Sequence, residues 1–321
     1  MSKDSQYLAI IDLGSNSVRL KIDQINLDGS YQTKQYEKRY VRLSSDMGPE
    51  KILKPEPIKR TLKALTEFRQ ICDQYKHLKI LAVATAAVRQ AQNQSDFLQQ
   101  VQEKTGFVIH VISGEQEAYL DYIGVSHTLA LKNGAILDTG GASMEIILVN
   151  DGQAEEVVSI PLGSVLLSQR YELGDQISAT NLFNAIVKVD QVLSKELWLN
   201  RVRHGELVAL GGCNRALAKI FRWRQAVNSS RVAPVHGLTM SPDEAFTIMQ
   251  QLLRSSRSER AKIRGVNKER ADVIVGGLLP LMSIVRQQQI QQIQFSDSGL
   301  REGLLFRYLE HETSLENLIT L

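Results

Sequence analysis

Two stretches of the sequence decide the fold. They are Tyr7–Tyr36, YLAIIDLGSNSVRLKIDQINLDGSYQTKQY, and Gly134–Ile160, GAILDTGGASMEIILVNDGQAEEVVSI. When Asp12 is placed over Asp138, small turn residues and apolar strand residues also coincide: Gly14 with Gly140, Ser17 with Ser143, Leu20 with Ile146, and Ile22 with Leu148. Each copy reads as an apolar strand, an Asp, a turn of small residues, a second strand, an Asp-Gly turn and a third strand. The pattern predicts a duplicated unit, against the alternative of chance similarity between two hairpins.

Helices and single strands alternate after each predicted β unit. Periodicity predicts helices over 55–76 and 178–199, a helix after the capping box at 241–244, a helix from about 269, and strands at 79–84, 107–112, 205–210 and 293–296. A βββαβα unit that is used twice predicts two α/β domains that face each other across a cleft.

The composition is that of a globular protein without a membrane span. Hydrophobic residues make up 43% of the 321 residues and charged residues 23%, and no run reaches the roughly 18 apolar residues of a span. Cys72 and Cys213 lie far apart without metal-ligand spacing, which favours a reducing, cytoplasmic location over a disulfide framework. The six histidines form no pair with zinc-ligand spacing. The net charge of +3 is compatible with a polyanionic partner but does not require one.

The two turns that follow Asp12 and Asp138 are candidate phosphate sites. Small residues in Gly14–Ser17 and Gly140–Ser143 let backbone N–H groups approach phosphate oxygens closely, as in nests and helix N-termini. The two Asp residues are candidate Mg²⁺ ligands, because Mg²⁺ takes one or two carboxylates together with substrate phosphates. Either turn alone is more often a plain tight turn, and it is their pairing in a duplicated unit that favours phosphate binding.

Glu117 is the candidate general base. Ser113 and Gln116 form a predicted capping box, so a helix starts after the strand at 107–112 and Glu117 lies in its first turn. Open α/β sheets place ligands at the carboxyl ends of strands, where a carboxylate can orient or deprotonate a water that attacks phosphorus. Acidic residues also suit helix N-termini, and the residues alone leave the two interpretations of Glu117 even.

Further candidates are charged residues and residues at strand ends. Arg19 and Glu145 occupy equivalent positions in the two copies, where the cation can neutralise phosphate and the anion can place water or metal. Thr85 and Arg89 follow a strand end, and Arg89 is either a phosphate contact or an ordinary surface arginine. A basic cluster is more often a solvated helix face than a polyanion site: Arg254, Arg257, Arg260, Lys262, Arg264, Lys268 and Arg270.

Seven motifs, taken in order, resemble those of the exopolyphosphatase/guanosine pentaphosphate phosphohydrolase family, within the acetate/sugar kinase, heat-shock-chaperone and actin superfamily. They are IDLGSNSVRL, ATAAVRQA, ISGEQEAYL, LDTGGASMEI, LGGCNRALAKI, VHGLTMS and SDSGLREGLL. The resemblance covers nearly the whole chain. It implies a duplicated actin-like, ribonuclease H-like α/β fold, in which residues 1–124, with 299–321 packing back on them, form one domain and residues 125–298 form the other.

The resemblance also implies a cytoplasmic, Mg²⁺-dependent exopolyphosphatase that releases terminal phosphate from inorganic polyphosphate, or an enzyme that converts pppGpp to ppGpp. It assigns catalysis to Glu117 and Glu145 and the metal to Asp12 and Asp138. The implied phosphate-binding residues are Gly14, Ser15, Asn16, Ser17, Arg19, Thr85, Arg89, Gly140, Gly141, Ala142 and Ser143. We expect neither a nucleic acid nor a membrane as a partner, and a homodimer is compatible with the sequence.

Departures from the family pattern put the rate and the chain-length preference in doubt. Ala142 stands where a glycine is usual and restricts positive φ, and Met144 stands where a threonine hydroxyl would reach phosphate. Gln116 replaces an acid, and Cys213 replaces a small hydroxyl residue. Two alternatives therefore accompany the hydrolase: an ATP-dependent kinase or ATPase of the same superfamily, and a non-catalytic sensor that binds pppGpp or polyphosphate.

Overall fold

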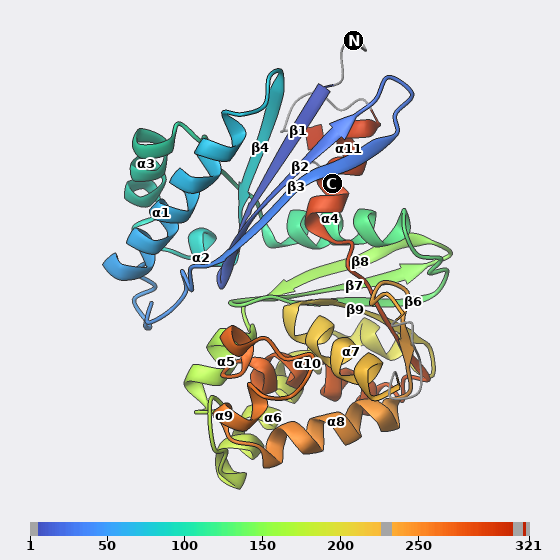
Figure 1. The fold of residues 1–321 in the computed structure, drawn as a ribbon. Coiled ribbons are helices and arrows are strands. Elements are labelled where there is room, and N and C mark those ends of the chain that lie inside the picture. The colour runs from blue at the N-terminus through green and yellow to red at the C-terminus, as the bar shows by residue number, and fades with distance from the viewer. Residues whose placement is uncertain (1–5, 226–232, 311–316, 319–321) are drawn as a thin grey trace. The chain divides into compact units, whose positions relative to one another are not determined.

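The computed structural model describes residues 6–225, 233–310 and 317–318 (Figure 1). The chain divides into two compact units: unit 1 comprises residues 1–117 and 304–321, and unit 2 comprises residues 118–303. The divisions fall within helices α4 (Gly114–Ser126) and α11 (Leu300–Leu309). The bounds predicted from the sequence, after residues 124 and 298, lie inside the first of these helices and just before the second. Part of the segment 299–321 is outside the described residues.

Unit 1 contains a five-stranded mixed sheet of order β3-β2-β1-β4-β5. Its elements are β1 (Gln6–Leu13), β2 (Ser17–Ile25), β3 (Tyr31–Tyr40), α1 (Pro55–Cys72), β4 (Leu78–Ala84), α2 (Ala86–Arg89), α3 (Gln94–Thr105) and β5 (His110–Val111), together with the start of α4 and the end of α11. β1 is antiparallel to β2 and parallel to β4. This arrangement places the end of β1 and the turn that follows it at the same sheet edge as the end of β4.

One face of the first sheet is covered by α1 and α3 (Figure 1). Residues of α1 that recur every three or four positions, among them Leu62, Leu65 and Phe68, pack against inward-facing strand residues such as Ile11 and Leu20. Each of these five side chains is at most 8% exposed. The burial of a continuous apolar layer fixes which strand residues face the core, and the polar strand-end residues follow from that register.

Unit 2 contains a six-stranded sheet of order β10-β11-β9-β6-β7-β8. Its elements are β6 (Gly134–Thr139), β7 (Met144–Asn150), β8 (Gln153–Ile160), α5 (Ser164–Arg170), α6 (Ala179–Leu193), η1 (Leu197–Val202), β9 (Glu206–Gly211), α7 (Gly212–Gln225), β10 (Thr239–Met240), α8 (Pro242–Arg254), α9 (Arg257–Arg260), η3 (Lys268–Arg270), α10 (Ile274–Gln287) and β11 (Gln292–Phe295), with parts of α4 and α11. The helices from α5 to α10 pack on one face of the sheet, and α4 packs on the other (Figure 1).

The two units repeat one architecture down to individual residues. The strand order β3-β2-β1-β4-β5 of unit 1 matches the order β8-β7-β6-β9-β11 of unit 2. The register shifts at residues 22/23 in unit 1 and 148/149 in unit 2, which are equivalent positions in the sequence alignment. A bulge is one extra residue in one strand, so its recurrence at the same place is a residue-level mark of duplication. The chain has the duplicated actin-like, ribonuclease H-like α/β fold that the sequence predicts.

Several predicted elements are shorter in the structure. The strand expected over 107–112 is reduced to His110–Val111, because only these two residues find ladder partners on β4. The helix expected over 178–199 ends at Leu193 and is followed by the 3-10 turn η1. The helix expected from about residue 269 begins at Ile274, after the short turn η3. Across the residues that the structure describes, no helix is both long and apolar enough to cross a membrane.

Candidate functional site

The turn between β1 and β2 in unit 1 presents backbone N–H groups. The Gly14 N–H donates to the Ser17 carbonyl at 3.2 Å and closes the turn. The carbonyls of Ser15 and Asn16 accept hydrogen bonds from N–H groups of the segment 41–44. Among the described residues, no hydrogen bond uses the N–H of Ser15 or Asn16 as its donor. Such N–H groups in a tight turn form the concave donor sites that bind phosphate oxygens.

Asp12 and Arg19, predicted as a metal ligand and a phosphate contact, are bonded to each other. They are direct cross-strand partners on β1 and β2, so their side chains lie on the same face of the sheet. Arg19 Nη1 donates to Asp12 Oδ2 at 3.0 Å. Asp12 is buried, with 7% of its surface exposed. The pair places one positive and one negative charge beside the first turn.

Thr85, Arg89 and Glu117 come together at the ends of β4 and β5. The Thr85 N–H donates to the Leu13 carbonyl at 3.2 Å, which places Thr85 next to the end of β1. Arg89 Nη1 donates to Glu117 Oε2 at 3.1 Å and to the Ile112 carbonyl at 2.9 Å. Two of the residues that the sequence offered as separate candidates therefore form one ion pair.

The first turn of α4 positions Glu117. The predicted capping box is confirmed: the Gln116 N–H donates to Ser113 Oγ at 3.1 Å, and the Ser113 N–H donates to Gln116 Oε1 at 2.8 Å. The Gln116 amide fills this capping role, so its difference from the acid usual in the family leaves the start of the helix intact. The capped turn holds the Glu117 backbone in place, and the Glu117 side chain is 13% exposed.

The turn between β6 and β7 in unit 2 repeats the geometry of the first turn. The Gly140 N–H donates to the Ser143 carbonyl at 3.0 Å. The carbonyls of Gly140 and Gly141 accept hydrogen bonds from Ser164 and Val165 at the start of α5, at 2.9–3.0 Å. Within the part of the chain that the structure describes, no hydrogen bond uses the Gly141 or Ala142 N–H as its donor. The second unit thus repeats the pair of N–H groups that the first turn presents.

The two unusual residues of this turn do not distort it. Residues 140–143 are absent from the positions with positive φ, so Ala142 carries no left-handed strain. Met144 is fully buried in the core of unit 2, and its side chain packs with the apolar residues of the strands and helices. Ala142 therefore needs no positive φ in this turn, and the side chain at position 144 faces the core of unit 2.

Asp138 and Glu145 are the carboxylates of unit 2. They are direct partners on β6 and β7, in the positions that Asp12 and Arg19 hold in unit 1. Glu145 is 1% exposed, and its Oε1 accepts a hydrogen bond from Ser159 Oγ at 2.8 Å. Their Cβ atoms are expected to lie about 5 Å apart, as is usual for cross-strand partners.

These carboxylates fit a magnesium site of the kind that uses few protein ligands. Among the described residues, no group of three or more His, Cys, Asp or Glu side chains is placed to hold a metal ion. Mg²⁺ does not need such a cage, since one or two carboxylates, waters and substrate phosphates complete its octahedron. Asp138 and Glu145, on one face of adjacent strands, provide the two carboxylates.

Gly211, at the end of β9, lies beside Asp138, and Arg270 of the basic cluster lies over the neighbouring Gly212. Gly211 has φ +90°, and a Cβ there would stand 2.5 Å from Asp138 Oδ1. Arg270 lies over Gly212, where any Cβ would overlap its guanidinium group, and its Nη1 donates to Cys213 Sγ at 3.6 Å. Arg270 is 7% exposed. The two glycines of the motif LGGCNRALAKI permit these close approaches, and the sequence did not indicate which side chains they would meet.

The basic cluster predicted as a solvated helix face is only partly so. Arg260 is completely buried, and its guanidinium group donates to the backbone carbonyls of Leu252, Leu173, Gly174 and Asp175. This burial lowers the pKa of Arg260. Arg260 and Arg270 are therefore structural residues of unit 2, and the prediction of a solvated face is wrong for both.

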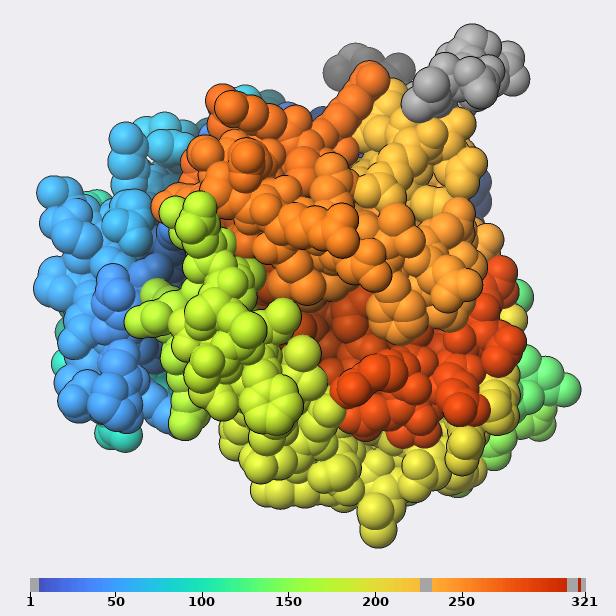
Figure 2. Space-filling model, turned by 90° about the horizontal axis from the view of Figure 1, so that it is seen from below, coloured from blue at the N-terminus to red at the C-terminus, as the bar shows by residue number. Residues whose placement is uncertain are grey.

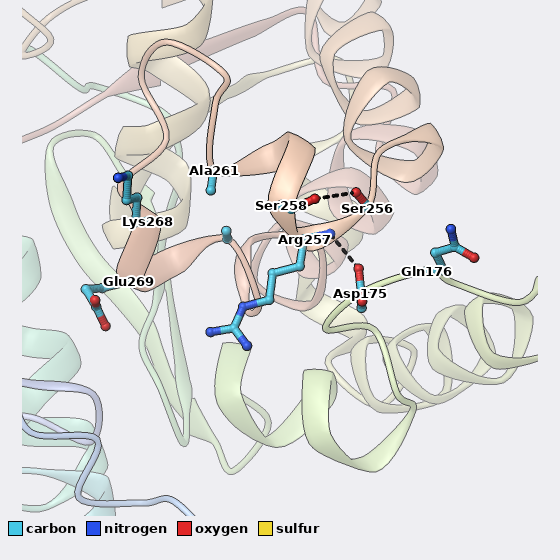
Figure 3. Close-up of a pocket in the computed structure, with 9 residues that line it drawn as sticks. Asp175, Gln176, Ser256, Arg257, Ser258, Ala261, Lys268 and Glu269 are labelled. Atoms are coloured by element: carbon cyan, nitrogen blue, oxygen red, sulfur yellow. Dashed lines mark hydrogen bonds between the residues drawn. The ribbon is translucent and has the colours of Figure 1, made fainter.

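A hollow of about 470 Å³ lies on the helical side of unit 2. It is lined by polar and charged residues of both signs: Asp175, Gln176, Ser256, Arg257, Ser258, Ala261, Lys268, Glu269 and Ala271 (Figure 3). The yellow-green and orange segments that carry them meet on the face shown in Figure 2, joined by the Arg257 N–H, which donates to Asp175 Oδ1 at 2.6 Å. None of the predicted site residues lines this hollow.

Two sheets of the same strand order, each with a carboxylate and a tight turn at the end of its first strand, place the chain in the class of proteins with a duplicated actin-like fold. A model of the Ppx/GppA phosphatase family matches residues 23–312. The chain therefore belongs to the Ppx/GppA phosphatase family, and its members are phosphatases.

Solved structures agree with this assignment. A Ppx/GppA family member from Aquifex aeolicus shares 29% identity and a TM-score of 0.76, over 97% of this chain and 100% of that one. An exopolyphosphatase from Cytophaga hutchinsonii has a TM-score of 0.86 at 24% identity, over 96% and 99% of the two chains. At that identity the second likeness shows the fold alone. An exopolyphosphatase-like protein is similar in the same way, with a TM-score of 0.84 at 23% identity over 95% of this chain and 98% of that one.

Proposed function

We propose that this phosphatase is an exopolyphosphatase, which hydrolyses the terminal phosphoanhydride bond of inorganic polyphosphate. The observation that carries the proposal is the pair of equivalent turns. Each turn follows a carboxylate and has two backbone N–H groups that donate to no acceptor among the described residues. A chain of phosphates repeats one anionic group, and two copies of one anion-binding turn suit such a ligand. The family membership supports the substrate class.

Each unit supplies its own part of the proposed machinery. In unit 1, the N–H groups of Ser15 and Asn16 bind phosphate oxygens, and Glu117 accepts the proton of a water that attacks the terminal phosphorus. In unit 2, the N–H groups of Gly141 and Ala142 bind further phosphate oxygens. The attack forms a new P–O bond, the anhydride P–O bond breaks, and the products are orthophosphate and a chain shorter by one phosphate.

In each unit, the carboxylate before the turn is a proposed ligand of Mg²⁺. Asp138, assisted by Glu145, would hold the ion in unit 2, and Asp12 is the equivalent residue of unit 1. The ion, when bound, neutralises charge on the phosphate oxygens, which phosphoryl transfer requires in addition to positioning. Ser159, through its hydroxyl, fixes the Glu145 carboxylate in place.

The alternative of a non-catalytic sensor has less support than catalysis. It depended on the altered second turn, and neither Ala142 nor Met144 disturbs that turn. No feature of the described residues favours guanosine pentaphosphate over polyphosphate, so pppGpp remains a competing substrate in the assay.

Phosphate release by the purified protein with Mg²⁺ tests the proposal. Long polyphosphate, tripolyphosphate, pppGpp and ATP are compared, with chelation of the metal as a control. We expect release from polyphosphate, and a loss of about 10²- to 10⁴-fold in kcat for Glu117→Gln. Glu115→Gln, an exposed residue two positions earlier in the same helical turn, is the matched control and should remain active. Phosphate release from pppGpp alone would show that pppGpp, and not polyphosphate, is the substrate. Near-normal release by Glu117→Gln would show that Glu117 is not the general base.

A further inference from the structure

One nitrogen of Arg89 joins the proposed base to the strand end before it. Arg89 Nη1 lies 3.1 Å from Glu117 Oε2 and 2.9 Å from the carbonyl oxygen of Ile112. The two side chains of the ion pair are 22% and 13% exposed. Pairs with so little exposure are screened much less by water and salt than surface pairs. The interaction is therefore a defined local feature of unit 1.

Arg89 itself is held in place by its own helix. It is the last residue of α2, and its N–H donates to the Thr85 carbonyl at 3.0 Å. The Ile112 carbonyl, its second acceptor, precedes the capping residue of α4 by one position. A guanidinium that bridges a strand end and a side chain in the next helical turn restricts the rotamers of that side chain.

The same contacts limit how Arg89 could contact a phosphate. Arginine usually binds phosphate through two parallel N–H groups of its fork. In this structure Nη1 already donates to two acceptors, so only the edge formed by Nε and Nη2 could face a phosphate. A phosphate dianion at the fork would compete with Glu117 for the same positive charge. Phosphate oxygens have other donors in unit 1, since the N–H groups of Ser15 and Asn16 are not used by the described residues.

We infer that Arg89 is a positioning residue for the reaction: it keeps the Glu117 carboxylate ionised and oriented toward the attacking water, and leaves phosphate binding to the backbone turns. This inference rests on the proposed role of Glu117. It reassigns Arg89, which the sequence suggested as a phosphate contact. It predicts that Arg89 affects the chemical step and not the affinity for substrate.

The experiment compares kcat and KM for polyphosphate in wild type, Arg89→Ala and Arg89→Lys. A positioning role lowers kcat of Arg89→Ala at least tenfold while KM stays within about twofold, because the loss is confined to the transition state. Millimolar guanidinium should restore part of that kcat, and Arg89→Lys should retain more activity than Arg89→Ala. The acidic limb of the pH–rate profile of Arg89→Ala should move to higher pH, because a carboxylate without its cation binds a proton more readily.

A second arm separates this inference from the proposed function. Arg89→Ala in the Glu117→Gln background should cause no further loss, since a residue that acts through Glu117 has nothing left to position. Arg201→Ala, which breaks an exposed ion pair with Glu155 in unit 2, is the control for loss of an ordinary pair. A KM that rises tenfold or more at unchanged kcat would make Arg89 a phosphate contact and overturn the inference. An inactive wild type would instead overturn the proposed function.

If Arg89→Ala does not fold, Arg89→Lys provides the test of the positioning role, because it keeps a cation at this position. If Arg89→Lys folds normally, its kcat and KM replace those of the alanine variant. Reduced kcat at unchanged KM then supports the inference, and raised KM at unchanged kcat overturns it. Circular dichroism shows whether each variant is folded, and the kinetics of the folded variant are compared with those of the wild type.

Discussion

At the scale of single residues, burial sets chemical behaviour more than residue type does. Arg260 is a charged residue, yet it is fully buried and donates to four backbone carbonyls. Arg257, three positions earlier, is exposed and forms a long ion pair with Asp272 at 3.6 Å. Two arginines of one short helix therefore have opposite roles, and the sequence alone does not distinguish them.

Replacement of Arg260 should be severely destabilising. Arg260→Met removes the donors to four carbonyls, of which, among the described residues, only that of Leu252 keeps another partner, the Ser255 N–H. We therefore expect a loss of about 3 kcal/mol or more in the free energy of unfolding. Arg257→Met on the same helix is the matched control, with an expected change within about 0.5 kcal/mol. Urea denaturation of both variants measures the difference. Equal stability of the two variants would mean that the buried guanidinium is dispensable.

Cys72 shows the same principle for a thiol. It is 1% exposed, and burial raises its pKa to about 11. At pH 8 only about one molecule in a thousand carries the reactive thiolate, so we expect alkylation at least a hundredfold slower than that of a free thiol. Cys213 is fully buried as well. Iodoacetamide labelling followed by mass spectrometry checks this, with urea-unfolded protein as the control, in which both cysteines should be labelled. Rapid labelling of the native protein would contradict it.

At the scale of elements, the junction of β9 and α7 depends on a glycine for two reasons. Gly211 has φ +90°, which disfavours any side chain, and a Cβ there would also collide with the Thr139 carbonyl and with Asp138 Oδ1, each at 2.5 Å. Gly152 in the same unit has φ +79°, but a Cβ at that position would have no neighbouring atom within 4 Å. The two glycines share the conformational strain and differ only in the collision.

This pair gives a direct test of the collision. Gly152→Ala should lose only the cost of a left-handed alanine, about 1 kcal/mol. Gly211→Ala should lose at least about 2 kcal/mol more and should lower kcat, because the new methyl group displaces Asp138. Urea midpoints and polyphosphate turnover of the two variants measure the difference. If Gly211→Ala were as stable and as active as Gly152→Ala, the backbone at the end of β9 would be able to shift and accommodate the methyl group at little cost.

What the sequence could predict at this scale was local. The strand, Asp, turn and strand pattern around Asp12 and Asp138 lies within a few residues, so its elements could be aligned from the sequence, whereas the register shifts at 22/23 and 148/149 were found only in the structure. The capping boxes at Ser113 and Ser241 were likewise readable from short spacings and are confirmed. The strand at 107–112 was overestimated, since its length depends on which residues find partners on β4.

The interactions that the sequence could not predict join distant segments. Arg89 and Glu117 are 28 residues apart, and each was a separate candidate until the structure paired them. Arg270 lies against Gly212, far earlier in the chain, and neither residue signals the other. The order of the strands in the sheets brings such residues together, and this order cannot be predicted from the periodicity of the sequence. The predicted roles of the site residues themselves remain predictions for the kinetic experiments.

At the scale of the whole molecule, the net charge is small although positive charges are concentrated locally. The net charge is only +3, too small for long-range attraction of a polyanion on its own. Around α7, however, cations gather: burial lowers the pKa of Lys219 most, and the positive charges of Arg215 and Arg222 on the same helix and of the buried Arg270 on η3 lower it further, with Asp297 opposing them. The cations that are not buried give this helix a local positive potential.

This distribution predicts how salt acts on the enzyme. Exposed cations attract a polyphosphate chain through a field that salt screens within about 10 Å at roughly 0.1 M, whereas backbone N–H groups act at contact and are screened little. KM for long polyphosphate should therefore rise roughly threefold to tenfold between low and high salt, while kcat stays nearly constant. Tripolyphosphate, which reaches fewer of the exposed cations, should show a smaller rise and serves as the matched comparison. A kcat that falls in parallel with the affinity would place the salt-sensitive charges in the chemical step, and the separation between exposed attraction and backbone binding would then be wrong.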